Sequence, residues 1–322
     1  MLQAFTGVFT LFSVMAAGWL LGRTGLLAET MEEPLSKLTI QVAIPCTLFL
    51  SCLRYMNAEL LKEVGWLLLL PLVSMLIAWG LAAAAARLFR IERERRGLFC
   101  VVFALSNSIF IGLPLCQSFF GDAALPFVTL YFPCNTLMFW TFGVAALSAD
   151  GGQPYKLAWG AVRRVFSPPL LAAIAGTAVA LAGWKPPEFL NFIETAIEYV
   201  GGLTTPLSLL IVGAMLSRMG RDAFRLGKAG TVALLGRFLV VPALTLGLCL
   251  LARHLGLADM PDTAMMVSVF TLEAAMPVMN QAVIMARVCR ADHALSARLL
   301  TASCLLGFVL LPVWVLVLES VL

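Results

Sequence analysis

The chain has 322 residues, of which 61% are hydrophobic and only 12% are charged, and its net charge is +4. With a mean hydropathy of +0.95, it has too few charged side chains to cover a soluble globule of this length. Uncharged runs recur from end to end and leave no room for a soluble catalytic domain. We therefore expect an all-α integral membrane protein.

Ten hydrophobic runs approach the roughly 20 residues that a helix needs to cross a bilayer. In chain order, we expect spans at about 2–21, 34–53, 64–86, 97–121, 123–148, 165–183, 199–216, 229–252, 263–286 and 299–318. No basic residue precedes the first run. We therefore predict a retained first helix rather than a secretory signal peptide.

The loops between these runs differ in charge. Those after the odd-numbered runs carry most of the Lys and Arg residues. Basic residues collect on the cytoplasmic side of a membrane, so we expect a multi-pass protein of the cytoplasmic (inner) membrane with both termini outside. The basic segment 87–96 is either an orientation signal or a contact for lipid phosphates. The net charge does not imply a nucleic-acid partner.

Ten spans with both ends on one side divide into two sets of five, 1–150 and 151–322, which would point in opposite directions. Two pairs of prolines support this division. Pro45 matches Pro206, and Pro114 matches Pro277 at nearly the same offset. Interrupted helices at matching places in inverted repeats are typical of secondary transporters that bind substrate near the bilayer midplane.

The fourth run contains a polar, helix-breaking stretch from Ser106 to Pro114, Ser-Asn-Ser-Ile-Phe-Ile-Gly-Leu-Pro. We expect Gly112 to end one half-helix and Pro114 to begin the next, with Pro277 repeating this in the ninth run. Such breaks survive at membrane depth only when buried in protein or lining a wet cavity. Opposed helix starts would offer N–H groups and positive dipole ends to an anion. Simple kinks at both prolines are the alternative.

Polar side chains flank both breaks. Asn107 and Ser108 lie at the first, while Asn280 and Gln281 follow the second. Amides can bind a carboxylate, an indole or hydroxyl group, or a cation, but they can also link helices. We favour a substrate-binding role for Asn107, and we leave both roles open for Asn135 in the fifth run.

Glu273 is the only carboxylate deep inside a run, one turn before Pro277. A charge at the bilayer centre costs about 2.5 to 3.5 kcal/mol on insertion scales, so Glu273 should face the interior or stay protonated. It would either couple transport to a proton or ion, or pair with Arg237 of the eighth run. Arg237 could instead extend toward the cytoplasmic face.

The chain lacks the motifs of several enzyme classes. There is no glycine-rich Lys-Ser/Thr phosphate loop, and its two histidines do not form a His-Glu-x-x-His pair. The cysteines fall mainly in apolar runs, and we interpret them as small apolar packing residues. We expect neither an enzyme nor a cofactor or metal site.

Four segments together resemble the auxin efflux carrier family, which includes the plant auxin carriers and bacterial carriers of malonate, malate and similar acids. They are Gln-Val-Ala-Ile-Pro-Cys-Thr-Leu-Phe around Pro45, Asn107 to Pro114, Pro206 to Gly213, and Glu-Ala-Ala-Met-Pro-Val-Met-Asn-Gln-Ala at 273–282; the tail 291–312 is similar too. The loop 149–164 is short, so the chain resembles the bacterial branch and lacks the long regulatory loop of plant carriers.

The resemblance implies ten helices in two inverted repeats, as in bile-acid symporters and sodium/proton antiporters. Spans one, two, six and seven would form a scaffold that dimerises, with Pro45 and Pro206 as its helix breaks. The other spans would form a transport domain in which spans four and nine cross, with Asn107 and the crossing prolines at the substrate. It implies export of a small organic anion, such as a mono- or dicarboxylate or an auxin-like acid. Proton- or sodium-coupled symport, or a channel or sensor, are the alternatives.

Overall fold

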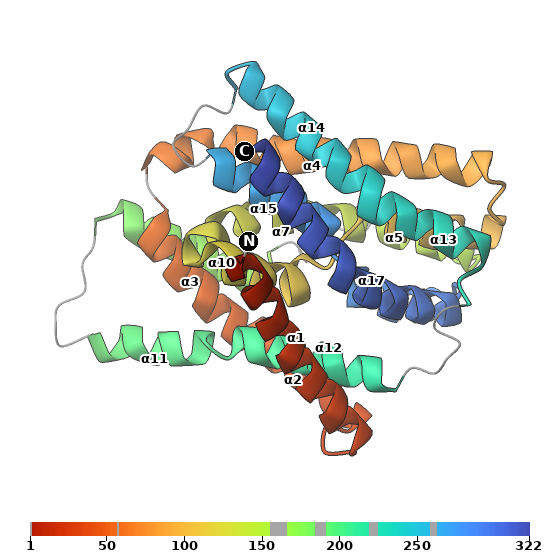
Figure 1. Cartoon of the computed structure of the whole chain (residues 1–322), viewed down its shortest axis with the longest axis horizontal. Helices are drawn as coiled ribbons and strands as arrows, with labels where there is room; N and C mark the ends of the chain where they lie inside the picture. The colour runs from red at the N-terminus through yellow and green to blue at the C-terminus, as the bar shows by residue number, and fades with distance from the viewer. Residues whose placement is uncertain (1, 57, 155–165, 184–190, 219–224, 258–262) are drawn as a thin grey trace. The chain divides into compact units, whose positions relative to one another are not determined.

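The computed structural model describes the chain except for residues 1, 57, 155–165, 184–190, 219–224 and 258–262. All regular structure in the described residues is helical (Figure 1). In the part of the chain that the structure describes, eight helical segments are long and apolar enough to cross a membrane: Glu29–Tyr55, Leu67–Leu88, Arg93–Phe120, Asp122–Asp150, Asn191–Ser217, Gly227–His254, Thr263–Val288 and His293–Val321. Two shorter apolar helices, Phe9–Arg23 and Pro168–Leu181, fall on the first and sixth expected spans.

The chain divides into two compact units, each built from three stretches of sequence. The first comprises Met1–Gly65, Ile109–Leu130 and Phe166–Arg218, and the second comprises Trp66–Ser108, Tyr131–Val165 and Met219–Leu322. These two units are not the two expected repeats. Each unit combines stretches from both halves of the sequence, whereas each expected repeat is one continuous half. The roles of scaffold and transport domain stay a prediction.

The described residues of the first unit form seven α-helices: α1 (Leu2–Arg23), α2 (Glu29–Leu38), α3 (Ile44–Tyr55), α6 (Leu113–Phe120), α10 (Pro168–Leu181), α11 (Asn191–Gly201) and α12 (Thr204–Ser217). The backbones of α1 and α12 touch because glycines leave room for them. A Cβ atom added to Gly213 would lie 2.0 Å from the Met15 carbonyl oxygen, and one added to Gly18 would lie 2.4 Å from that of Leu210. These two helices therefore pack more closely than larger side chains would allow.

Pro45 and Pro206 both lie in the first turn of a helix, α3 and α12 respectively. A proline is tolerated there because the first N–H groups of a helix have no partner within it. Thr47, two residues after Pro45, links α3 to α12 through its side chain. Its hydroxyl donates to the Gly201 carbonyl at 2.9 Å and lies 2.8 Å from the Thr204 hydroxyl.

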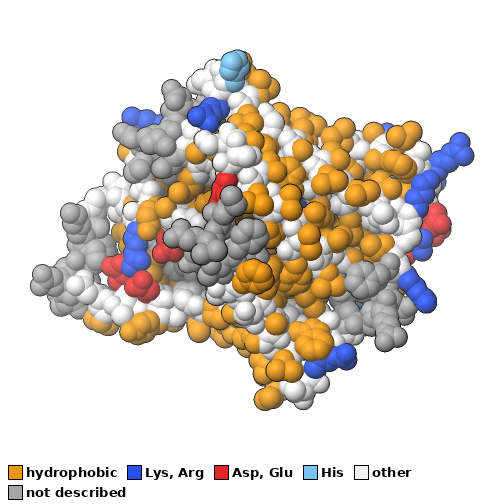
Figure 2. Space-filling model, in the orientation of Figure 1, with side chains coloured by type: hydrophobic (Ala, Val, Ile, Leu, Met, Phe, Trp, Pro, Cys, Tyr) orange, Lys and Arg blue, Asp and Glu red, His pale blue; other side chains and the backbone are white. Residues whose placement is uncertain are grey.

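The two longest described helices, α4 (Ala58–Leu88) and α17 (His293–Val321), belong to the second unit. Its other described α-helices are α5 (Arg96–Ala104), α7 (Leu125–Met138), α8 (Val144–Asp150), α13 (Gly227–Leu235), α14 (Val241–His254), α15 (Thr263–Ala275) and α16 (Asn280–Val288). A few residues of α4 and α7 belong to the first unit. Apolar side chains cover the visible face of α14 and α17, and charged ones lie at their ends (Figure 2). This distribution is that of helices surrounded by lipid.

Candidate functional site: two interrupted helices that meet

The fourth apolar run is interrupted at Leu105 to Asn107, before the place that we predicted. Helix α5 ends at Ala104, and a π-helical turn, Ser108–Gly112, leads into α6. Gly112 itself is helical, with φ −63° and ψ −52°, so it does not end the first half-helix. Pro114 does lie in the first turn of α6. The wider π-helical turn absorbs the hydrogen bond that a proline cannot donate.

Asn135 explains why the helix breaks where it does. Its Nδ2 atom donates to the Ser106 carbonyl at 2.8 Å, and its Oδ1 atom accepts from the Ser106 N–H at 3.2 Å. The same Nδ2 lies 3.4 Å from the Ser108 hydroxyl. The side chain thus replaces the helical partners of the buried Ser106 backbone. Of the two roles left open for Asn135, these bonds favour the helix-linking one.

The ninth run is interrupted at Met276 to Met279, between α15 and α16. Pro277 lies inside this non-helical stretch, and α16 begins three residues later, at Asn280, so the prediction that Pro277 opens the second half-helix is wrong. A contact from α17 holds the stretch extended: the Val278 N–H donates to the Ser303 hydroxyl at 3.0 Å. That bond gives the buried backbone a partner outside the helix.

The two interruptions touch each other. The Asn107 N–H donates to the Pro277 carbonyl at 2.9 Å, and both residues are buried within the second unit. Non-helical backbone at this depth requires protein partners, and each stretch supplies one to the other. Two segments 170 positions apart in the chain, both chosen from sequence as breaks, therefore form one locus.

Glu273 and Arg237 are both completely buried near this locus. Arg237 lies in a π-helical turn, Gly236–Val240, between α13 and α14. Its Nη2 donates to the carbonyl of Ala274, in the last turn of α15 and next to Glu273 in the chain. The side chain therefore reaches into the unit rather than toward the cytoplasmic face. Tyr131 is also buried.

The remaining predicted residues lie elsewhere. Gly112 and Pro114 belong to the first unit, because its boundary with the second falls between Ser108 and Ile109. Asn280 is partly exposed and Gln281 is exposed at the start of α16. The structure therefore gathers six of the predicted residues within the second unit's buried interior: Asn107, Ser108, Asn135, Arg237, Glu273 and Pro277.

The first unit holds a cavity that the sequence did not reveal. Its volume is about 410 Å³. Its polar lining comes from Thr10, Thr47, Ser51, Arg54, Gln117, Ser118, Asp122, Glu198 and Thr205, and Pro114 is the one predicted residue on its wall. These side chains come from six separate parts of the chain, so no local pattern points to them.

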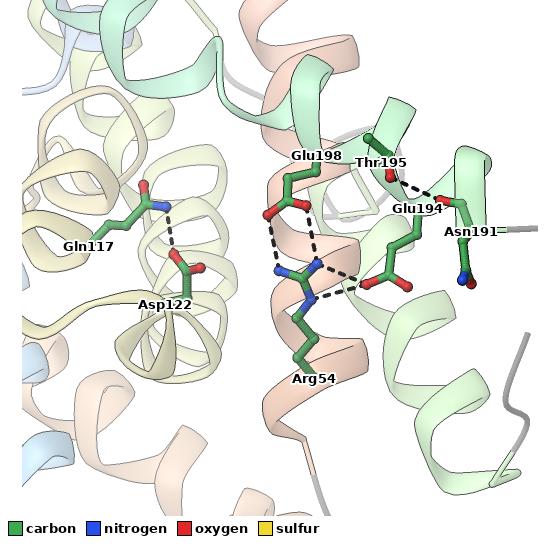
Figure 3. A network of polar contacts seen from close by, with 7 residues as sticks. All are labelled: Arg54, Gln117, Asp122, Asn191, Glu194, Thr195 and Glu198. Atoms are coloured by element: carbon green, nitrogen blue, oxygen red, sulfur yellow. Dashed lines mark hydrogen bonds and ion pairs between the residues drawn. The ribbon is translucent and has the colours of Figure 1, made fainter. Parts of the chain in front are cut away.

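Polar contacts order one side of this cavity (Figure 3). Arg54 on α3 lies 2.8 Å from Glu194 and 3.4 Å from Glu198, measured between nitrogen and oxygen. The two glutamates lie four residues apart on α11, on one face of that helix. Gln117 donates to Asp122 at 2.8 Å and accepts from Thr205 at 3.2 Å. The spacing of the glutamates was the only sequence signal for this network.

Two interrupted helices touch each other in a buried polar region, and the described residues contain eight candidate spanning helices. Together these features define the class of multi-pass membrane transporters. Comparison with known proteins agrees with this class. The chain belongs to the membrane transport protein family, that of the auxin efflux carriers, whose model matches residues 3–158 and 157–315. A match in two successive halves is in keeping with an internal repeat. It is a family of transporters and not of enzymes.

Two relatives are similar over nearly the whole chain. An uncharacterized transporter of Methanothermobacter thermautotrophicus is 30% identical over 319 residues, which cover 97% of each protein. An uncharacterized transporter of Methanocaldococcus jannaschii is 24% identical over 298 residues, covering 90% of this chain and 91% of the relative. Neither name specifies a substrate.

Proposed function

We propose that this membrane transporter is a secondary carrier that exports a small organic anion across the cytoplasmic membrane. The observation that carries the proposal is the direct bond between the two helix interruptions, from the Asn107 N–H to the Pro277 carbonyl. Paired interruptions of this kind surround the midplane substrate site of secondary transporters. Alternating access would expose this locus first to one side of the membrane and then to the other.

The chemistry of the locus supports an anion. α16 begins at Asn280, directly after the non-helical stretch, and the positive end of its helix dipole favours negative charge. Arg237 adds the positive charge of a buried guanidinium beside Ala274. Asn107 contributes an amide at the crossing. A mono- or dicarboxylate, or an indole acid, would offer these groups the acceptor oxygens that they require.

Two further features belong to the proposal. A dimer through the first unit is expected from the family resemblance, with membrane lipid around it. The charge of the loops supports an orientation with both termini outside.

Counterflow in proteoliposomes tests the carrier. Vesicles preloaded with unlabelled malonate, acetate or indole-3-acetate should accumulate the labelled acid transiently, and uptake should saturate. A channel would pass the acid without counterflow, and a sensor would bind it without passage. Either result would contradict the carrier assignment.

Glu273 is the residue that we assign to coupling, with a proton as the first candidate and sodium as the second. It is completely buried beside the interruption, where a carboxyl group can exchange a proton as the site changes sides. Glu273→Gln should keep the folded protein and remove the pH dependence of transport. Imposed proton and sodium gradients distinguish the two ions. Unchanged pH dependence in the variant would reject Glu273 as the proton carrier.

A further inference from the structure

Arg237 is held inside the second unit by local features of its helix. It lies in the π-helical turn Gly236–Val240, and such turns re-aim side chains and occur frequently at functional sites. Gly236 permits the close approach of this turn to α5, since an added Cβ would lie 1.9 Å from the Phe103 ring. The Phe238 carbonyl of the same turn accepts from the Trp314 indole at 2.7 Å. The turn that carries Arg237 is thus fixed from two sides.

The guanidinium group has more donors than the described structure uses. Nη2 donates to the Ala274 carbonyl, but Nε and Nη1 are buried and have no hydrogen-bond partner among the described residues. A buried charged donor that lacks an acceptor is strongly destabilising, and native proteins rarely retain one without a reason. Arg237 is also the only buried Lys or Arg side chain in the described part of the chain.

A purely structural role accounts for only part of this arrangement. A cation near the last carbonyls of α15 is favourable because of the helix dipole, and the bond to Ala274 provides that stabilisation. This bond to Ala274 does not involve the Nε or Nη1 atoms of Arg237. A neutral donor such as glutamine would also suffice for one carbonyl. The charge and the two remaining nitrogens therefore point to a further acceptor that carries a negative charge.

We propose that Arg237 is the residue that binds the carboxylate of the transported anion, with Nε and Nη1 as its donors. This inference rests on the proposed function and specifies its substrate class. When Glu273 is protonated, Arg237 is the single buried charge among the described residues that faces the ligand, and the site then favours a substrate that brings a single negative charge. A monocarboxylate, or a dicarboxylate with one group protonated, fits this balance, whereas a full dianion leaves one charge uncompensated in the interior.

Matched pairs of ligands separate charge recognition from a general effect on folding. We would measure binding of indole-3-acetate and indole-3-acetamide, and of butyrate and butyramide, to the purified full-length protein by calorimetry. The wild-type protein should prefer each acid over its amide by at least about tenfold, as expected for a charge-assisted hydrogen bond. Arg237→Gln should abolish that preference, while the substitution Arg253→Gln, at an exposed arginine of the following helix α14, should retain it.

Two other variants keep the test decisive if Arg237→Gln does not fold. Arg237→Lys preserves the charge but loses the planar donor geometry, so the preference for acids should shrink without vanishing. Glu273→Gln removes a carboxylate next to Ala274 and should tighten binding of the acids but not of the amides.

The outcomes separate the two proposals. If the wild-type protein binds no acid, the anion assignment fails and this inference with it. If it prefers acids and Arg237→Gln keeps the same preference, only the role of Arg237 is overturned. Equal weakening of acids and amides in Arg237→Gln would show a structural role alone and would also overturn it.

Discussion

The two units keep their charged groups in opposite settings. In the first unit, Arg54 and Glu194 are about one-third exposed and lie beside a cavity, where water weakens their attraction. In the second unit, Arg237 and Glu273 are fully buried beside interrupted helices. The first arrangement contributes little to stability and adapts easily. The second arrangement costs free energy because both charged groups are removed from water, and such intramembrane charges are usually retained for function.

The units also differ in what holds their helices. Backbone contacts through glycine join α1 and α12 in the first unit, with no polar side chain needed between them. In the second unit, side chains such as Asn135 and Ser303 bond to backbone that has left the helix. The contact between α1 and α12 is therefore sensitive to added volume, and the two helix interruptions are sensitive to lost hydrogen bonds.

The largest effect should come from adding one methyl group between α1 and α12. Gly213→Ala places a Cβ atom 2.0 Å from the Met15 carbonyl oxygen, so the two helices must separate. We expect a loss of at least about 3 kcal/mol in the free energy of unfolding, measured by thermal denaturation in detergent. Gly247→Ala on α14 is the control, because no atom lies within 4 Å of its new Cβ. Equal melting of the two variants would contradict the close contact.

The corresponding change in the second unit removes a side chain rather than adding one. Asn135→Ala leaves the buried N–H and carbonyl of Ser106 without their partner, which should reduce the free energy of unfolding by about 2 to 3 kcal/mol. The same denaturation assay measures it. Asn191→Ala, on the exposed surface of α11, should change stability by less than about 0.5 kcal/mol. A wild-type melting temperature for Asn135→Ala would contradict the stabilising role that we assign to the Asn135 side chain.

A smaller effect, on affinity rather than stability, is expected at the crossing itself. Asn107→Ala keeps the backbone bond to Pro277 and should keep the fold. Loss of the amide should weaken binding of the transported acid roughly tenfold, since one hydrogen bond to a charged group is removed. Calorimetry with an acid that exchanges in counterflow measures this change. Normal affinity would mean that Asn107 does not contact the substrate.

The smallest effect should come from the network in Figure 3. Arg54→Gln removes the contacts to Glu194 and Glu198, but exposed ion pairs contribute less than about 1 kcal/mol. Its loss of stability should shrink further in high salt, where the wild-type contact is screened. A loss comparable to that of Asn135→Ala would erase the difference between the two units.

The general architecture could be predicted from the sequence because hydrophobicity, net charge and helix-breaking residues affect the structure of the segments in which they occur. The helices fall on the ten expected runs, and both interruptions occur in the runs where Gly, Pro and polar residues cluster. The class of membrane transporter and the family are confirmed. The inverted orientation of the two halves and the roles of the site residues stay predictions.

The exact positions of the interruptions were not predictable from local chemistry. Asn135 and Ser303 determine them, from helices distant in sequence from the backbone that they bind. Proline chemistry alone placed the first break several residues too late. It placed the start of α16 at Pro277, three residues too early. The cavity of the first unit was missed for the same reason, since its polar lining is dispersed along the chain.

The boundary between Ser108 and Ile109 has a mechanical consequence. It divides the fourth run, so that α5 belongs to one unit and α6 to the other, and it lies within the π-helical turn next to Asn107. A regular α-helix resists changes in its backbone torsions more than an irregular turn does. The π-helical turn is therefore the part of the fourth run whose torsions change most readily.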